Sequence, residues 1–224
     1  FCGPHKPYDA PQRYLDMFPL EQEDDFLLPE GQVIAQKDKE ALWRQRRSSK
    51  AMIKLIDDQI GEILRLLEKR GMMEDTLVLF TSDHGDMLGD HYLLQKGVPW
   101  RQAVNVPLAI RLPGAEPTGE NPYPVELSDL AATILDYAGL DARQALSRSW
   151  PAYNDIIPSR SLLPVLRGEA DRCRDFCFAE SDFTEERVQG IPVTDTPYWR
   201  GAGGRRSNAW QAIITEKSKY IKYL

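Results

Sequence analysis

The stretch that most constrains the fold is residues 76–96, with the sequence TLVLFTSDHGDMLGDHYLLQK. It begins with an apolar, β-branched run over 76–81, which predicts a strand buried on both faces of a parallel or mixed sheet. The run stops shortly before Asp83 and His84, and Gly85 then lets the chain turn away. Open α/β sheets gather their ligands at the carboxyl ends of their strands, so the functional site is predicted here.

Candidate site residues lie in this stretch and in one upstream segment. Asp83 and His84 are candidate metal ligands, since carboxylate oxygen and imidazole nitrogen both bind divalent cations. Lys96 follows in a loop with two glycines, and its compact ammonium could pair with a phosphate or sulfate group. His5 lies far upstream between two prolines, which hold its backbone stiff. Taken singly, His5 and Lys96 would be interpreted as surface side chains.

The three histidines of the chain all fall in these two segments, because His91 lies in the same loop as Lys96. This clustering indicates a site that needs imidazole near a metal. A hard cation such as Ca²⁺ takes about six to eight oxygen ligands, however, and two ligands cannot hold it. The other carboxylates are therefore expected to come from elsewhere.

A long helix is predicted to precede the strand. Apolar residues recur every three or four positions from Met52 to Leu67, which is typical of one face of an amphipathic helix, and the helical pattern begins at Asp38. Gly71 is a natural stop. The paired acids Asp57 and Asp58 lie on this helix and are interpreted as part of its solvated face.

Weaker patterns predict the remaining elements. They are a short helix at 12–17, strands at 106–112, 176–179, 210–215 and 219–224, and a helix that Ser128 or Asp129 caps, that runs through Tyr137 and that stops at Gly139. The last two strands turn around residues 216–218, so a small, antiparallel carboxyl-terminal unit is expected. Residues 141–160 are weakly patterned and mark the candidate subdomain boundary. The glycine-rich stretch 201–204 lacks the spacing of a phosphate-binding signature and is interpreted as a linker.

Composition excludes several function classes. The chain has 28 Lys and Arg against 34 Asp and Glu, a net charge of -6, and the charges are interspersed, so no nucleic-acid footprint is indicated. No apolar run approaches the roughly 18–20 residues of a membrane span, and no signal peptide is visible in this chain. Three cysteines form neither a disulfide framework nor a metal-finger pattern. The cellular compartment therefore stays open between periplasmic or secreted and cytoplasmic.

Taken together, the motifs resemble the carboxyl-terminal half of type I sulfatases, in the alkaline phosphatase-like superfamily. The resemblance runs through nearly the whole chain, and the spacing of Asp83, His84 and Lys96 with His5 far upstream is its most specific part. The matching motifs are PHKPY at 4–8, DDQIG at 57–61, SDHGD at 82–86, LGDH at 88–91, KG at 96–97, VPL at 106–108, LSDLA at 127–131 and IITEKSKY at 213–220.

The resemblance implies an α/β fold, an α/β/α sandwich with a mixed sheet and a small carboxyl-terminal antiparallel sheet. By the same likeness, residues 1–145 form the carboxyl-terminal part of the catalytic α/β domain. Residues 146–224 begin the smaller subdomain.

The implied activity is hydrolysis of a small-molecule or saccharide sulfate ester. In that family a formylglycine, made from a cysteine, attacks sulfur while Ca²⁺ polarises the sulfate oxygens, with Mg²⁺ and Mn²⁺ as alternative metals. The likeness puts Asp83 and His84 in the metal shell, Lys96 on the sulfate and His5 beside the leaving-group oxygen. His91 either touches substrate or supports the loop.

The chain departs from the family pattern in its first residues. The two amino-terminal metal aspartates and the nucleophile motif are absent, and the sequence CGPHK at 2–6 imitates that motif with Lys6 where arginine belongs. The chain opens without methionine and is interpreted as a fragment, inactive alone, whose expected partner is the missing amino-terminal half. The alternatives are a phosphonate monoester or phosphodiester hydrolase of the same superfamily, and a non-catalytic truncated domain.

Overall fold

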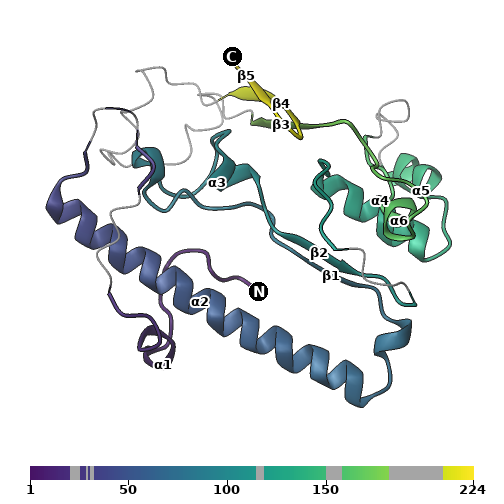
Figure 1. Cartoon of the computed structure of the whole chain (residues 1–224), viewed down its shortest axis with the longest axis horizontal. Coiled ribbons are helices and arrows are strands. Elements are labelled where there is room, and N and C mark those ends of the chain that lie inside the picture. Colours follow the sequence, from purple (N-terminus) through teal and green to yellow (C-terminus); the bar gives the residue numbers. More distant parts are fainter. Residues whose placement is uncertain (21–25, 29, 31–32, 115–118, 150–157, 182–208) are drawn as a thin grey trace. The chain divides into compact units, whose positions relative to one another are not determined.

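The computed structural model describes residues 1–20, 26–28, 30, 33–114, 119–149, 158–181 and 209–224 (Figure 1). The described residues belong to two compact units that alternate along the chain. Of the described residues, the first unit contains those within Phe1–Thr76 and His84–Lys96, and the second contains those within Leu77–Asp83, 97–181 and 209–224. The division into residues 1–145 and 146–224 stays a prediction.

The first unit is built around one long helix, α2 (Gln36–Lys69), which has 34 residues. Its end is a Schellman motif: Gly71 has a φ of 66°, the Gly71 amide donates to the Glu68 carbonyl, and the Met72 amide donates to the Leu67 carbonyl. The predicted stop at Gly71 is therefore confirmed. The unit also contains α1 (Gln12–Leu15) and two short 3₁₀ turns, η1 (Met73–Asp75) and η2 (Asp90–Tyr92).

The core of this unit lies against the amino-terminal half of α2. One buried cluster consists of Phe26, Ile34, Leu42 and Trp43, and a second consists of Ala10, Tyr14 and Ala51. Further along the helix, Ile53 and Ile63 are 53% and 51% exposed. The predicted apolar stripe is thus present on α2, but the described residues bury it only in part: Met52 packs against the second cluster, whereas Ile53 and Ile63 stay exposed.

The predicted strand before Asp83 is β1 (Val78–Thr81), which pairs with β2 (Leu108–Arg111) in the second unit. The pair is antiparallel, with Val78 opposite Arg111, and Phe80 is 43% exposed. The expectation of burial on both faces is therefore wrong for this strand. An apolar, β-branched run shows that a strand forms, but it does not show what covers its faces. β2 begins after Pro107, which cannot donate a ladder hydrogen bond.

Four helices follow in the second unit: α3 (Arg101–Val104), α4 (Leu127–Tyr137), α5 (Ala142–Ser149) and α6 (Leu163–Leu166). Helix α4 starts earlier than predicted: its N-cap is Glu126 and not Ser128 or Asp129, because Glu126 and Asp129 form a reciprocal capping box. Helix α5 lies where the sequence was too weakly patterned to predict an element.

The carboxyl-terminal sheet confirms the predicted small antiparallel unit. It has three strands in the order β3 (Phe176–Ser181), β4 (Trp210–Thr215) and β5 (Lys219–Tyr223). The β4–β5 turn is closed by the Thr215 amide, which donates to the Ser218 carbonyl over 2.8 Å. The glycine-rich stretch 201–204 lies outside the described residues.

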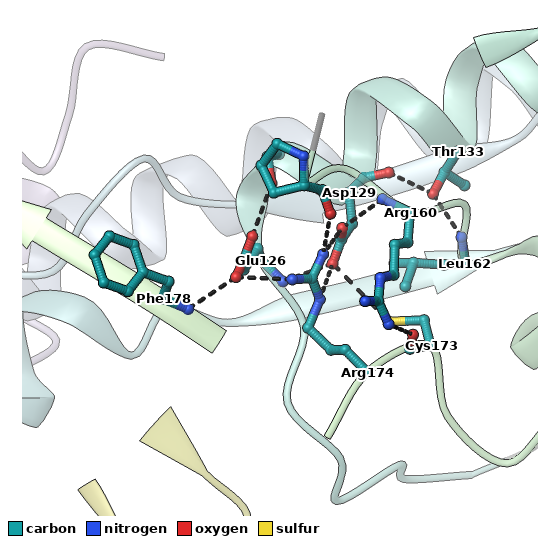
Figure 2. A network of polar contacts seen from close by, with 10 residues as sticks. Glu126, Asp129, Thr133, Arg160, Leu162, Cys173, Arg174 and Phe178 are labelled. Atoms are coloured by element: carbon teal, nitrogen blue, oxygen red, sulfur yellow. Dashed lines mark hydrogen bonds and ion pairs between the residues drawn. The ribbon is translucent and has the colours of Figure 1, made fainter. Parts of the chain in front are cut away.

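A buried polar network ties α4 to the segments that follow it (Figure 2). Asp129 is fully buried and Arg174 is 6% exposed. The Arg174 guanidinium donates to both oxygens of Asp129, to Glu126 Oε1 over 2.8 Å and to the Pro158 carbonyl over 2.9 Å. Glu126 Oε1 also accepts the Phe178 amide of β3 over 2.8 Å, so one charge cluster joins the helix start to the sheet.

No helix within the described ranges combines the length and the apolar character that a membrane span requires.

Candidate active site

His5 and Lys96, which are 91 positions apart in the sequence, meet in the first unit. His5 Nδ1 lies 2.8 Å from the Lys6 carbonyl oxygen. A carbonyl oxygen can only accept, so Nδ1 carries the proton and the lone pair of the neutral imidazole is on Nε2. Lys96 Nζ lies 3.0 Å from that Nε2 and donates to it. The exposed imidazole and the half-buried ammonium therefore form a hydrogen-bonded pair.

His84 lies beside this pair. Its ring centroid is 6.5 Å from that of His5, and the two rings are inclined at 67°. His84 Nδ1 lies 2.9 Å from the Gly85 carbonyl oxygen, which again puts a proton on Nδ1, so that the neutral imidazole has its lone pair on Nε2. Metal-binding histidines almost always donate their second ring nitrogen in this way, so the arrangement suits a metal ligand.

Arg46 of α2 holds the loop that carries His84 and Lys96. The guanidinium of Arg46 donates to the Leu88 carbonyl over 2.8 Å and to Asp90 Oδ1 over 2.8 Å, and it stacks 3.9 Å above the ring of Phe26. Gly89, between these anchors, has a φ of 99°. A Cβ at that position would lie 2.8 Å from the Phe26 ring, so only glycine fits there.

The other two predicted site residues, Asp83 and His91, lie at the two ends of the first half of this loop region, after β1 and in η2. Asp83 follows β1 with an exposed side chain, receives a long hydrogen bond of 3.4 Å from Ser82 Oγ, and directly precedes His84 in the chain. His91 lies in η2 with a left-handed φ of 53°, and its amide donates to the Leu27 carbonyl over 2.6 Å. The roles of both residues stay predictions.

The ligand set for a metal is incomplete within the described residues, where no cluster of three or more His, Cys, Asp or Glu side chains could hold an ion. Asp83 and His84 are chemically suited to contribute one oxygen and one nitrogen donor. A Ca²⁺ ion needs about six to eight ligands, most of them oxygen, so these two side chains could form only part of a shell.

Two residues that sequence reasoning did not select also join the site. Tyr8 Oη donates to Asp86 Oδ2 over 2.7 Å, which links the proline-flanked loop of His5 to the loop of Lys96. Tyr8 lies in the motif PHKPY at 4–8 and Asp86 in SDHGD at 82–86, but nothing in the sequence shows that the two residues contact each other across 78 positions.

The family model described as Sulfatase matches residues 1–140. The chain is 31% identical over 204 residues to an arylsulfatase of Clostridium perfringens, covering 83% of this chain and 40% of that protein. It is 31% identical over 179 residues to a choline-sulfatase of Rhizobium meliloti, covering 70% of this chain and 34% of that protein.

Among solved structures, the phosphonate monoester hydrolase of Silicibacter pomeroyi matches with a TM-score of 0.74 and 26% identity, over 98% of this chain and 46% of that one. The chain therefore spans less than half the length of each of these three proteins.

Proposed function

Because the chain belongs to the sulfatase family, we propose that it carries the sulfate-binding and leaving-group side of a sulfate ester hydrolase. The observation that supports this proposal is the contact between Lys96 Nζ and His5 Nε2 at 3.0 Å, with the His84 ring 6.5 Å from that of His5. A cation, a proton carrier and a metal-competent imidazole within one small region match the needs of ester cleavage at an oxyanion.

In this proposal Lys96 binds the negative oxygens of the ester. A preorganised cation aimed at charge that develops in the transition state lowers the barrier, because its position requires no reorganisation during the reaction. The Lys96–His5 pair also shares a proton between Nζ and Nε2. That proton passes to the ester oxygen as the bond from sulfur to this oxygen breaks, so the leaving group departs as a neutral alcohol or phenol.

We place Asp83 and His84 in a Ca²⁺ shell, with Mg²⁺ and Mn²⁺ as alternatives, and expect further carboxylates and the formylglycine nucleophile from outside these 224 residues. When bound, the metal would polarise the sulfate oxygens. We assign His91 to substrate contact or to support of the loop. By this count the 224-residue chain alone does not turn over substrate. Calorimetric binding of Ca²⁺ to the chain alone should be weak or absent, and tight binding would contradict the ligand count.

A second candidate is hydrolysis of phosphonate monoesters or phosphodiesters, which the likeness to the solved phosphonate monoester hydrolase favours. Attack at phosphorus and attack at sulfur need similar positive surroundings, so the pair of His5 and Lys96 serves either reaction. The third candidate is a non-catalytic domain that docks on its other half.

The deciding experiment assays the full-length protein with an aryl sulfate and an aryl phosphonate monoester that share one leaving group. We expect the higher kcat/KM with the sulfate. A phosphonate preference of about tenfold, which corresponds to roughly 1.4 kcal/mol in transition-state binding, would reject sulfate as the substrate class. Turnover of neither ester would favour the non-catalytic candidate.

A further inference from the structure

The loop that ends at Lys96 holds a concentration of unfavourable backbone conformations. Within the described residues, every non-glycine residue with a left-handed φ lies in this loop: Leu88 at 44°, His91 at 53°, Tyr92 at 60° and Gln95 at 66°. Such conformations persist only where the surrounding structure fixes them, and they are concentrated at functional sites. Something in the fold must therefore hold this loop closed.

The carboxylate of Asp86 holds the loop closed by accepting hydrogen bonds from both of its ends. Its Oδ1 accepts the Leu88 amide over 3.0 Å and the Gln95 amide over 2.8 Å, so it joins the two ends of the left-handed stretch. The Met87 amide adds a backbone bond to the Gln95 carbonyl over 2.9 Å. Gln95 directly precedes Lys96, and the hydrogen bonds at Gln95 therefore fix the position of the Lys96 backbone.

The second oxygen of the same carboxylate reaches the loop of His5. Tyr8 Oη donates to Asp86 Oδ2 over 2.7 Å, and Tyr8 is three residues from His5. Burial, followed by the hydrogen bond to Asp86 and the negative charge of that carboxylate, raises the pKa of Tyr8 above its usual range, so the hydroxyl keeps its proton and remains a donor. One carboxylate thus binds both loops whose side chains meet at the Lys96–His5 pair.

We infer that Asp86 and Tyr8 are positioning residues, which hold the Lys96 ammonium within hydrogen-bonding distance of the His5 imidazole. Lys96 has a flexible four-carbon side chain and His5 is exposed, so the contact between them depends on where the backbones of the two loops lie. This role rests on the proposed function, because it concerns the pair to which that function assigns substrate binding and proton transfer.

The kinetic test uses Tyr8→Phe, which removes only the hydroxyl, in the full-length protein. We expect kcat for an aryl sulfate to fall roughly 10- to 100-fold with KM little changed, as for a small misplacement of catalytic groups. In a Lys96→Ala background the same substitution should cost almost nothing further. Independent, multiplying losses would overturn the inference. Tyr220→Phe, at a tyrosine that is 68% exposed, is the matched control and should keep wild-type kinetics.

The Asp86 variants separate geometry from charge. Asp86→Asn keeps an oxygen for the two amides and an amide group opposite Tyr8, so it should retain most of kcat. Asp86→Ala removes every partner and should lose at least as much as Tyr8→Phe. Equal losses in the Asn and Ala variants would overturn the positioning role. Asp9→Ala removes an exposed carboxylate next to Tyr8 in the sequence, so it controls for charge and should keep the wild-type kcat.

Hydrogen exchange at the Gln95 amide tests the inference without an activity assay. We expect about tenfold or faster exchange in Asp86→Ala, together with faster exchange in Tyr8→Phe, because a hydrogen bond to a charged acceptor has been lost or weakened. Unchanged exchange in both variants overturns it. If the wild-type protein cleaves neither sulfate nor phosphonate esters, the proposed function fails, but this measurement still shows whether Asp86 and Tyr8 hold the loop.

Discussion

Replacing Arg174 with methionine should destabilise the second unit far more than the same change at Arg172. Arg174 is 6% exposed and bridges Asp129 and Glu126, whereas Arg172 has a 52% exposed side chain and pairs with Asp175 over 3.0 Å. Removing one partner of a buried ion pair costs about 3–5 kcal/mol, because the remaining charge is left uncompensated. An exposed pair is worth about 0–1 kcal/mol.

The structure explains why the larger figure applies to Arg174. Without the guanidinium, two carboxylates stay close together. Asp129 keeps the backbone amides of Glu126 and Arg160, each at 2.8 Å, and the weak Cys173 thiol donor at 3.9 Å. Glu126 keeps the Phe178 amide over 2.8 Å, the Ser128 hydroxyl over 3.1 Å and the Asp129 amide of the capping box. These hydrogen bonds from neutral groups do not offset the negative charges of the buried Asp129 and the largely buried Glu126.

The assay is urea unfolding of the full-length Arg174→Met and Arg172→Met variants, with the m-value checked for constancy. A double-mutant cycle with Asp129→Asn measures the coupling between the two buried residues. The reasoning is refuted if Arg174→Met costs less than about 1 kcal/mol, or no more than Arg172→Met.

Three further predictions concern the site and the thiols. His5→Ala should reduce kcat/KM most for substrates with poor leaving groups, and equal losses across a series of aryl sulfates would contradict its role as proton donor. Asp83→Asn should lower the metal content of the purified full-length protein, measured by atomic emission, and turnover should fall with it; full retention would exclude Asp83 as a ligand. Burial, followed by the charge of Glu126, raises the pKa of Cys177 from 9.0 to about 12. The folded state then holds this proton more tightly, so its stabilising effect is complete below pH 9 and is lost as the pH rises toward about 12. The urea midpoint should therefore fall less over this range in Cys177→Ala than in wild type, and equal falls would contradict the assignment.

Local patterns in the sequence were sufficient for the elements that are stabilised locally. The spacing of apolar residues and Gly71 predicted α2 and its end, and two short strand-like runs separated by residues 216–218 predicted the β4–β5 hairpin. Both depend on contacts between residues close in the chain, which periodicity and turn chemistry report directly.

Features set by long-range contacts could not be predicted in the same way. The pairing of β1 with β2 and its exposed face depend on what lies beside the strand, and the four residues 78–81 carry no information about that. Helix α5 was missed because residues 142–149 have a low apolar content, so no stripe marked a core-facing side.

The candidate site shows the same division. Clustering of the three histidines and the placement of Lys96 after the strand were enough to select the segments, and the structure brings His5, Lys96 and His84 together. Which nitrogen of each imidazole carries the proton depends on the carbonyl oxygens of Lys6 and Gly85, which only coordinates reveal. The bond from Tyr8 to Asp86 likewise depends on the fold.

The most direct test of the account is the kcat of the full-length Lys96→Ala variant on an aryl sulfate, compared with wild type and with Lys217→Ala, an exposed lysine in the β4–β5 turn. Loss of a preorganised donor to a developing oxyanion costs about 10²–10³ in kcat, so we expect Lys96→Ala to fall by that factor while Lys217→Ala stays at the wild-type rate. A wild-type protein that cleaves aryl sulfates and a Lys96→Ala variant with the same kcat would contradict the assignment of Lys96, and with it the proposed site.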